Sequence, residues 1–217
     1  KVRQAVMYSI DREAVAKVVG FGIDPATYYW WKDGQPGYDP SLPKYSHDPG
    51  KAKQLMAEAG MSEGPEVTYV SVNRPQDVTM SEVIQAQLLQ AINVRVKIDK
   101  LEQVAWQNAT RSGNWDQTQT RVSITAPDPS IFATWMYSGN AYQYSNKEVD
   151  RLYDKARATY DAKEQAETYK ELQKVLFEDA GLSPIFFWLR NDVTNKQVKG
   201  WLPQPWHWNL RYVWLDQ

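Results

Sequence analysis

A strand, a helix and a second strand follow one another between residues 67 and 98, and this unit constrains the fold more than any other part of the sequence. Residues 67–72 form a β-branched and aromatic run typical of a strand, and residues 94–98 alternate apolar and charged side chains. Between them, a predicted helix over residues 78–91 places Ile84 and Leu88 on one face. Two strands joined in this way lie parallel, and the loop after the first strand reaches the carboxyl edge, where ligands of open sheets usually bind. The unit therefore predicts an α/β fold with a binding edge near residue 73.

Apolar periodicity and capping residues predict further elements on both sides of this unit. Asp11 and Asp48 are each followed by apolar residues at helical spacing, and Gly60 ends the helix that Asp48 begins. A polar strand is predicted over residues 117–124, and two amphipathic helices over 147–160 and 162–180 are expected to cover one sheet face. The nearly all-apolar residues 183–189 predict a central buried strand. The remaining predicted elements are a helix from Val2 to Ile10, a helix over 103–112, a helix through Phe132 and Met136, a loop over 23–47 and an aromatic tail from Lys196.

Composition excludes several classes of function. The chain has no cysteine, so it offers neither a thiolate zinc site nor a cysteine nucleophile. Its 25 basic and 26 acidic residues are spread along the chain without a basic block, which argues against nucleic-acid binding. His47 and His207 lack the spacing of a metal site, and no phosphate-binding glycine loop or nucleophile-elbow motif is present. The sequence thus predicts no metal, no cofactor and no catalytic residue.

Several stretches taken in order carry a resemblance to a known family. They are residues 2–14, the helix 48–60, residues 82–88, the region from Asp150 to Ile185, and Val198-Lys199-Gly200. Together they resemble the bacterial extracellular solute-binding proteins of family 5, the dipeptide, oligopeptide and nickel type of binding protein. The resemblance runs from one end of the chain to the other.

The resemblance implies a periplasmic-binding-protein-like α/β lobe of type II, with a mixed, mainly parallel sheet flanked by helices. Residues 1–197 are expected to form the second, carboxy-terminal lobe, and residues 198–217 an aromatic tail that returns toward the first lobe. The opening residues contain neither a signal-peptide core nor an initiator methionine, so the chain is expected to begin inside a larger protein. The implied partners are a peptide or other small solute, the first lobe and an ABC transporter permease, in the periplasm or outside a Gram-positive membrane.

Two loops carry the ligand contacts that the resemblance implies. Asn73 and Arg74 stand where dipeptide binders hold the ligand's carboxylate with an arginine, and a guanidinium pairs bidentately with such a group. An ion pair with a nearby acid is the alternative. Thr125 stands where peptide binders usually carry an aspartate for the ligand's ammonium group, and a hydroxyl cannot neutralise that charge. Asp128 is a possible substitute or simply a helix cap. Asn93 replaces a glycine that usually closes the preceding helix, so a differently shaped turn is expected there.

Ten tryptophans and thirteen tyrosines leave the ligand class open. Trp30, Trp31 and Trp135 are either core residues or faces of a cleft that stack on a ligand. Arg74 favours a peptide ligand. The absence of an aspartate at Thr125 and the abundance of aromatic side chains favour an oligosaccharide or a sugar conjugate. Metal chelates and other anions are further possibilities. A secreted hydrolase and a purely structural interaction fragment are the alternatives from other classes.

Overall fold

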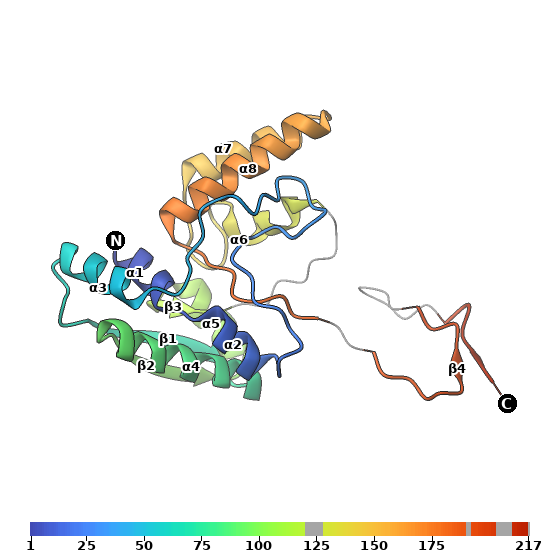
Figure 1. The fold of residues 1–217 in the computed structure, drawn as a ribbon, viewed down its shortest axis with the longest axis horizontal. Coiled ribbons are helices and arrows are strands. Elements are labelled where there is room, and N and C mark those ends of the chain that lie inside the picture. Colours follow the sequence, from blue (N-terminus) through green and yellow to red (C-terminus); the bar gives the residue numbers. More distant parts are fainter. Residues whose placement is uncertain (120–127, 190–191, 203–209, 217) are drawn as a thin grey trace.

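A computed structural model describes residues 1–119, 128–189, 192–202 and 210–216 (Figure 1). The predicted strand-helix-strand unit is confirmed: β1 (Glu66–Val72) and β2 (Arg95–Leu101) are parallel, with Val72 opposite Leu101, and α4 (Pro75–Ile92) connects them. β3 (Gln117–Thr118) pairs with the other side of β1, also in parallel, and gives the order β2-β1-β3. The predicted mixed sheet is therefore parallel throughout in the part described, and residues 120–124 of the predicted third strand lie outside it.

Alternate residues of β1 face two different layers, as the twofold period of a strand requires. Tyr69 packs with Ile84 and Leu88 of α4. Val70 and Val72 face the other way and pack on Trp106 of α5 (Gln103–Ser112). Beyond α4, the same core includes residues of three further helices, α1 (Val2–Ser9), α2 (Arg12–Val19) and α3 (Pro49–Glu58).

The helix ends follow the predicted capping chemistry. The side chain of Asp11 accepts a hydrogen bond from the Ala14 N–H, and that of Asp48 accepts one from the Lys51 N–H. Asn93 ends α4 with φ 58° and ψ 15°, the left-handed conformation that a glycine usually supplies. The expected change in the shape of this turn is therefore wrong, because asparagine tolerates that conformation.

The amphipathic pair α7 (Lys147–Ala158) and α8 (Ala162–Asp179) does not cover the sheet. The two helices pack on each other and, with Phe132 and Met136, enclose Trp31 from the loop over residues 23–47. Figure 1 shows them as a layer apart from the sheet. The short elements η1 (Pro129–Phe132) and α6 (Ala133–Met136) belong to the same layer. The prediction was wrong because a second core, built on Trp31, takes up the apolar stripes of both helices.

Residues 183–189 do not form the central strand that was predicted. They make only an isolated antiparallel bridge, Ala26 with Phe186, flanked by hydrogen bonds from Thr27 N–H to the Ile185 carbonyl and from Phe187 N–H to the Pro25 carbonyl. Trp188 is 41% exposed, which no central strand would allow. The neighbouring segment begins at Pro25, which has no N–H to continue a ladder.

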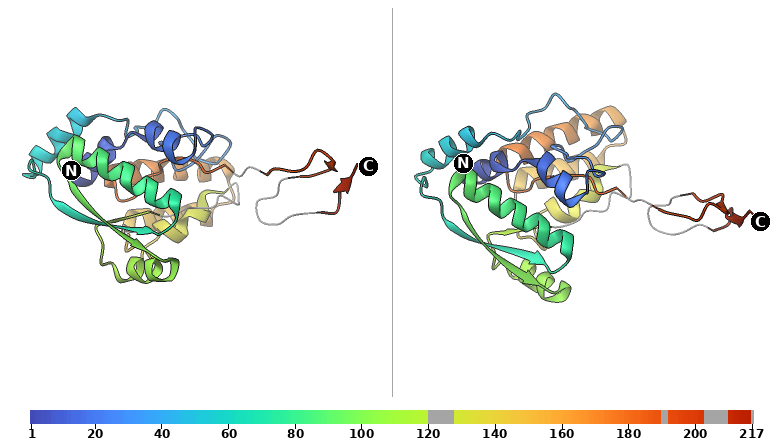
Figure 2. Two further views of the ribbon diagram at one scale, coloured as in Figure 1. Left: turned by 90° about the horizontal axis from the view of Figure 1, so that it is seen from below. Right: turned by 60° about the horizontal axis from the view of Figure 1, so that its bottom comes forward.

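The described part of the tail contains a two-stranded antiparallel ribbon. β4 (Val198–Lys199) pairs with β5 (Trp214–Leu215), and this part of the chain projects away from the rest (Figure 2). Five of its apolar side chains are more than half exposed: Leu202, Leu210, Tyr212, Trp214 and Leu215. None of the helices described combines the length and the apolar character that a membrane span requires.

Candidate functional site

The carboxyl ends of β1 and β2 bring the predicted residues Asn73 and Arg74 to one edge of the sheet. The Asn73 N–H donates to the Leu101 carbonyl at 2.7 Å, so the loop after β1 is fixed to the end of β2. The Asn73 side chain donates to Glu102 Oε1 at 2.9 Å. Glu102 is a residue of this edge that sequence reasoning missed; its position directly after the second strand of a parallel pair was the available signal.

Arg74 lies at this edge, where its side chain is half-exposed and forms an ion pair. Its Nε lies 2.7 Å from Oδ2 of Asp77, and the two side chains are 48% and 3% exposed. Arg74 is also the N-cap of α4, which begins at Pro75, so its backbone lies at the positive end of an 18-residue helix. The ion pair with a nearby acid, considered as an alternative from the sequence, is therefore present, and the guanidinium still reaches solvent.

A buried network of polar side chains lies beneath this edge. Gln119, just after β3, donates through Nε2 to the Asp77 carbonyl at 2.9 Å and to Ser71 Oγ at 3.3 Å. The Tyr69 hydroxyl donates to Gln119 Oε1. Burial, and then the nearby Asp77 carboxylate, raise the pKa of Tyr69, so this hydroxyl keeps its proton and remains a donor. The network ties β1, β3 and the first turn of α4 together.

The second predicted loop is described only in part. Thr125 lies outside the described residues. Asp128 accepts a hydrogen bond from the Ser130 N–H at 2.7 Å and one from the Tyr169 hydroxyl at 2.9 Å, which is the arrangement of a helix cap. Burial is the main cause of a raised pKa at Tyr169, and the bond to Asp128 adds to it. The structure thus places Asp128 in the cap that begins η1.

The three predicted tryptophans differ in their exposure. Trp31 is 0% exposed and donates its Nε1–H to the Tyr169 carbonyl at 3.2 Å, so it is a core residue with no face open to a ligand. Trp30 is half-buried, with its ring centroid 6.1 Å from that of Phe132 in an edge-on contact. Trp135 is also half-buried. Trp31 thus belongs to the layer of α7 and α8, whereas Arg74 and Asn73 lie at the sheet edge.

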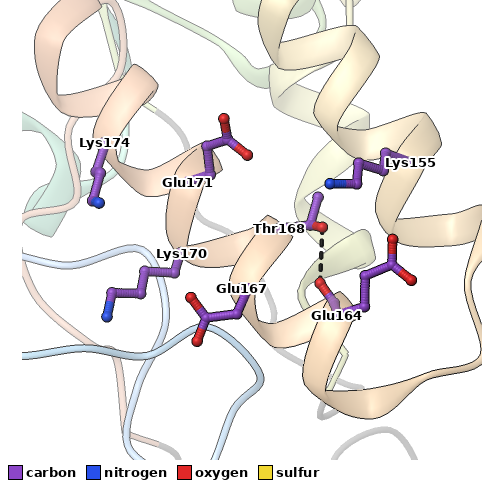
Figure 3. A pocket seen from close by; sticks show the side chains of 7 residues that line it. All are labelled: Lys155, Glu164, Glu167, Thr168, Lys170, Glu171 and Lys174. Atoms are coloured by element: carbon purple, nitrogen blue, oxygen red, sulfur yellow. Dashed lines mark hydrogen bonds between the residues drawn. The ribbon is translucent and has the colours of Figure 1, made fainter.

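A hollow on the outer surface of α7 and α8 is lined by charged side chains of both signs (Figure 3). Lys155 comes from α7, and the other lining residues, among them Glu167, Lys170 and Glu171, come from α8. Lys170 is paired with Asp39 at 2.5 Å. The hollow is a solvated, charged helix surface, and it lacks the apolar walls of a ligand pocket.

Metal-binding groups do not converge in the part of the chain that the structure describes. There, no three histidine or acidic side chains gather closely enough to hold an ion. Nδ1 of His47 lies 3.8 Å from Oδ2 of Asp11, beside the helix cap at Asp48. His207 lies outside the described residues.

The sequence is similar to a family of known proteins and to individual members of it. Residues 1–144 match the family described as bacterial extracellular solute-binding proteins, family 5 Middle. The dipeptide-binding protein of Escherichia coli (strain K12) is 28% identical over 217 residues, which cover 94% of this chain and 40% of that protein. The heme-binding protein A of Haemophilus influenzae is 26% identical, over 98% of this chain and 41% of its own length. The chain therefore spans about 40% of the length of these curated relatives.

A solved structure repeats the fold. The dipeptide binding protein from Pseudoalteromonas sp. SM9913, in complex with Met-Leu, is 24% identical and superposes with a TM-score of 0.86, over 99% of this chain and 45% of that one. At this identity the likeness shows a periplasmic-binding-protein fold and nothing finer. Since the family match covers well over half of the chain, the chain belongs to the bacterial extracellular solute-binding proteins of family 5.

Proposed function

We propose that this chain is the carboxy-terminal ligand-binding lobe of the solute-binding component of an ABC importer, and that it holds a peptide by its carboxylate. One observation carries the proposal: Arg74 stands at the carboxyl edge of a parallel sheet and at the start of α4, with its guanidinium half-exposed. Ligands of open α/β sheets bind at such edges. A guanidinium beside a helix N-terminus suits an anion, because both carry positive charge toward it.

The electrostatics of the pair determine how such a ligand would bind. Asp77 neutralises the charge of Arg74, so long-range attraction alone would be weak. Asp77 contacts Nε, and a guanidinium carries two more amino groups at its tip, which match the two oxygens of a carboxylate. We therefore expect recognition by a bidentate geometry, with Asn73 at the rim of the site.

The rest of the binding cycle requires a second lobe. We propose that residues 1–197 form one lobe and that the tail over 198–217 contacts the other, since its exposed apolar residues include Trp214 and Leu215. Closure of the two lobes would be stabilised by ligand contacts that exist only in the closed state. Delivery to a membrane permease, from the periplasm or from outside a Gram-positive membrane, completes the proposal, and we expect no bond chemistry.

A thermal-shift screen of the two-lobed protein against di- and oligopeptides, opines and oligosaccharides tests this proposal, because a ligand of the native state raises its apparent stability. We expect a shift with peptides that Arg74→Ala largely removes, since losing hydrogen bonds to a charged group costs about 2–3 kcal/mol, or 30- to 150-fold in affinity. Arg151→Ala is the matched control, because Arg151 forms an exposed i,i+3 pair with Glu148 on α7.

Three outcomes separate the alternatives. A shift with saccharides alone would overturn the peptide proposal and favour a sugar or sugar-conjugate ligand. Cleavage of a tested peptide or glycoside would establish a hydrolase. A peptide shift that Arg74→Ala and Arg151→Ala leave equally intact would place the carboxylate contact elsewhere.

A further inference from the structure

We infer that Asp77 is a positioning residue, which holds the Arg74 guanidinium in the orientation that receives a ligand's carboxylate. The inference deepens the proposed function and rests on Arg74 as the anion contact. Asp77 does not need to touch the ligand in this role. It acts through Arg74 and so determines the selectivity of the edge for a carboxylate.

The burial of Asp77 distinguishes this pair from an ordinary surface ion pair. The Asp77 side chain is 3% exposed, whereas Arg74 is 48% exposed, and Oδ2 and Nε are 2.7 Å apart. A buried carboxylate is immobile and is costly without a partner. The guanidinium is thereby anchored at one atom to a rigid point, and its tip remains at the surface. An arginine without such an anchor would lose more rotamer freedom when a ligand binds.

The backbone of Asp77 is anchored as well. Gln119 donates to its carbonyl oxygen at 2.9 Å, and the Tyr69 hydroxyl in turn holds Gln119. The first turn of α4 is therefore connected to β1 and to the residue after β3. An aspartate in the first turn of a helix also offsets the helix dipole, but an exposed side chain would serve that purpose equally well. The dipole of α4 does not explain why the Asp77 carboxylate is directed toward Arg74.

Calorimetric titration of the two-lobed protein with the dipeptide Met-Leu and with its carboxy-terminal amide tests the inference. The ratio of the two affinities measures selectivity for the carboxylate. We expect Asp77→Asn to reduce this ratio about 10-fold, as losing one charge-assisted contact at a bidentate site would do. We expect Arg74→Ala to abolish the selectivity, and the double variant to match Arg74→Ala, because the two residues act as one unit.

Glu148→Gln is the matched control, because Glu148 forms an i,i+3 pair with Arg151 that is distant from the sheet edge in sequence and in layer. It should leave the ratio unchanged. If Asp77→Asn weakens both ligands equally, Asp77 is merely structural and the inference is overturned.

The Nε–H resonance of Arg74 in the unliganded protein gives a second readout that needs no ligand. We expect a resolved signal, slow to exchange with water, that Asp77→Asn broadens or removes, while Glu148→Gln affects only Arg151. An Arg74 signal unchanged by Asp77→Asn would refute the inference. A native protein that binds Met-Leu and its amide equally would refute Arg74 as the carboxylate contact, and the resonance would then decide separately whether Asp77 orients Arg74.

Discussion

Replacing Arg12 by methionine should cost more stability than any surface substitution in this chain. The Arg12 side chain is 2% exposed, and burial lowers its pKa to about 10, so it stays charged at neutral pH. Its partners are uncharged. The guanidinium donates to the carbonyl oxygens of Pro184, Tyr45, Met7 and Ile10 and to the hydroxyl of Ser183, at distances from 2.6 to 3.4 Å.

The expected magnitude follows from those contacts. The bonds to Pro184, Tyr45 and Ser183 are the shortest, at 3.0, 2.8 and 2.6 Å. Hydrogen bonds that involve a charged group contribute about 1.5–3 kcal/mol each. Methionine fills part of the volume and removes the cost of burying a charge, which offsets part of the loss. We therefore expect the free energy of unfolding to fall by about 3–5 kcal/mol, the range for breaking a buried polar cluster.

Urea unfolding followed by tryptophan fluorescence measures this loss. With a slope of about 2–3 kcal/mol per molar, the urea concentration at the unfolding midpoint should fall by about 1–2.5 M. Arg3→Met is the control: Arg3 contacts Asp179 at 2.7 Å, but its side chain is 65% exposed, so a change below about 1 kcal/mol is expected. Equal unfolding midpoints for the two variants would refute the conclusion that the buried hydrogen bonds of Arg12 stabilise the fold.

Three further substitutions test other parts of the structure. Gly64→Ala should cost about 2–4 kcal/mol in thermal unfolding, because its φ is +70° and a Cβ would lie 2.3 Å from the Asn93 carbonyl oxygen; Gly34→Ala, with φ +82° and open space around it, should cost clearly less. Trp31→Ala should cost about 3–5 kcal/mol by urea unfolding if this tryptophan is core, and a stable variant with weaker ligand binding would contradict that. Asp128→Ala should cost about 1 kcal/mol as a lost cap and leave the peptide affinity unchanged; a large loss of affinity by calorimetry would make Asp128 a ligand contact.

Local signals in the sequence predicted the local structure well. The unit over residues 67–98 could be predicted because the twofold and 3.6-fold periods of its apolar residues reflect which faces are buried. The caps at Asp11 and Asp48 could be predicted because a capping side chain bonds within three residues of itself. The position of Arg74 directly after the first strand of a parallel pair was likewise enough to place it at the carboxyl edge of the sheet.

Partners that are distant in sequence could not be predicted in the same way. The apolar stripe of α7 shows that one side of the helix is buried, but it does not show which residues cover that side. Among the covering residues is Trp31, more than 100 residues earlier in the sequence. An apolar run such as residues 183–189 does not say how many strands adjoin it. Gln119 reaches Asp77 across 42 residues, whereas the i,i+3 spacing of Arg74 and Asp77 was the signal that could have named the nearby acid, which sequence reasoning left unidentified.

Contacts between the first 26 residues and residues 178–187 have a consequence for the order of folding. Arg3 pairs with Asp179, the side chain of Gln4 donates to the Glu178 carbonyl, and Ala26 bridges to Phe186. At about 5–20 residues per second of synthesis, the later partners follow the earlier ones by roughly 10–35 s. Throughout that interval the opening helices lack the segment that secures them, and Arg12 lacks Ser183 and Pro184. In a chain stalled before residue 178, the Arg12 guanidinium therefore keeps the Met7, Ile10 and Tyr45 carbonyls within its reach but faces water where Ser183 and Pro184 later cover it, so this part of the core closes only after synthesis has passed residue 184.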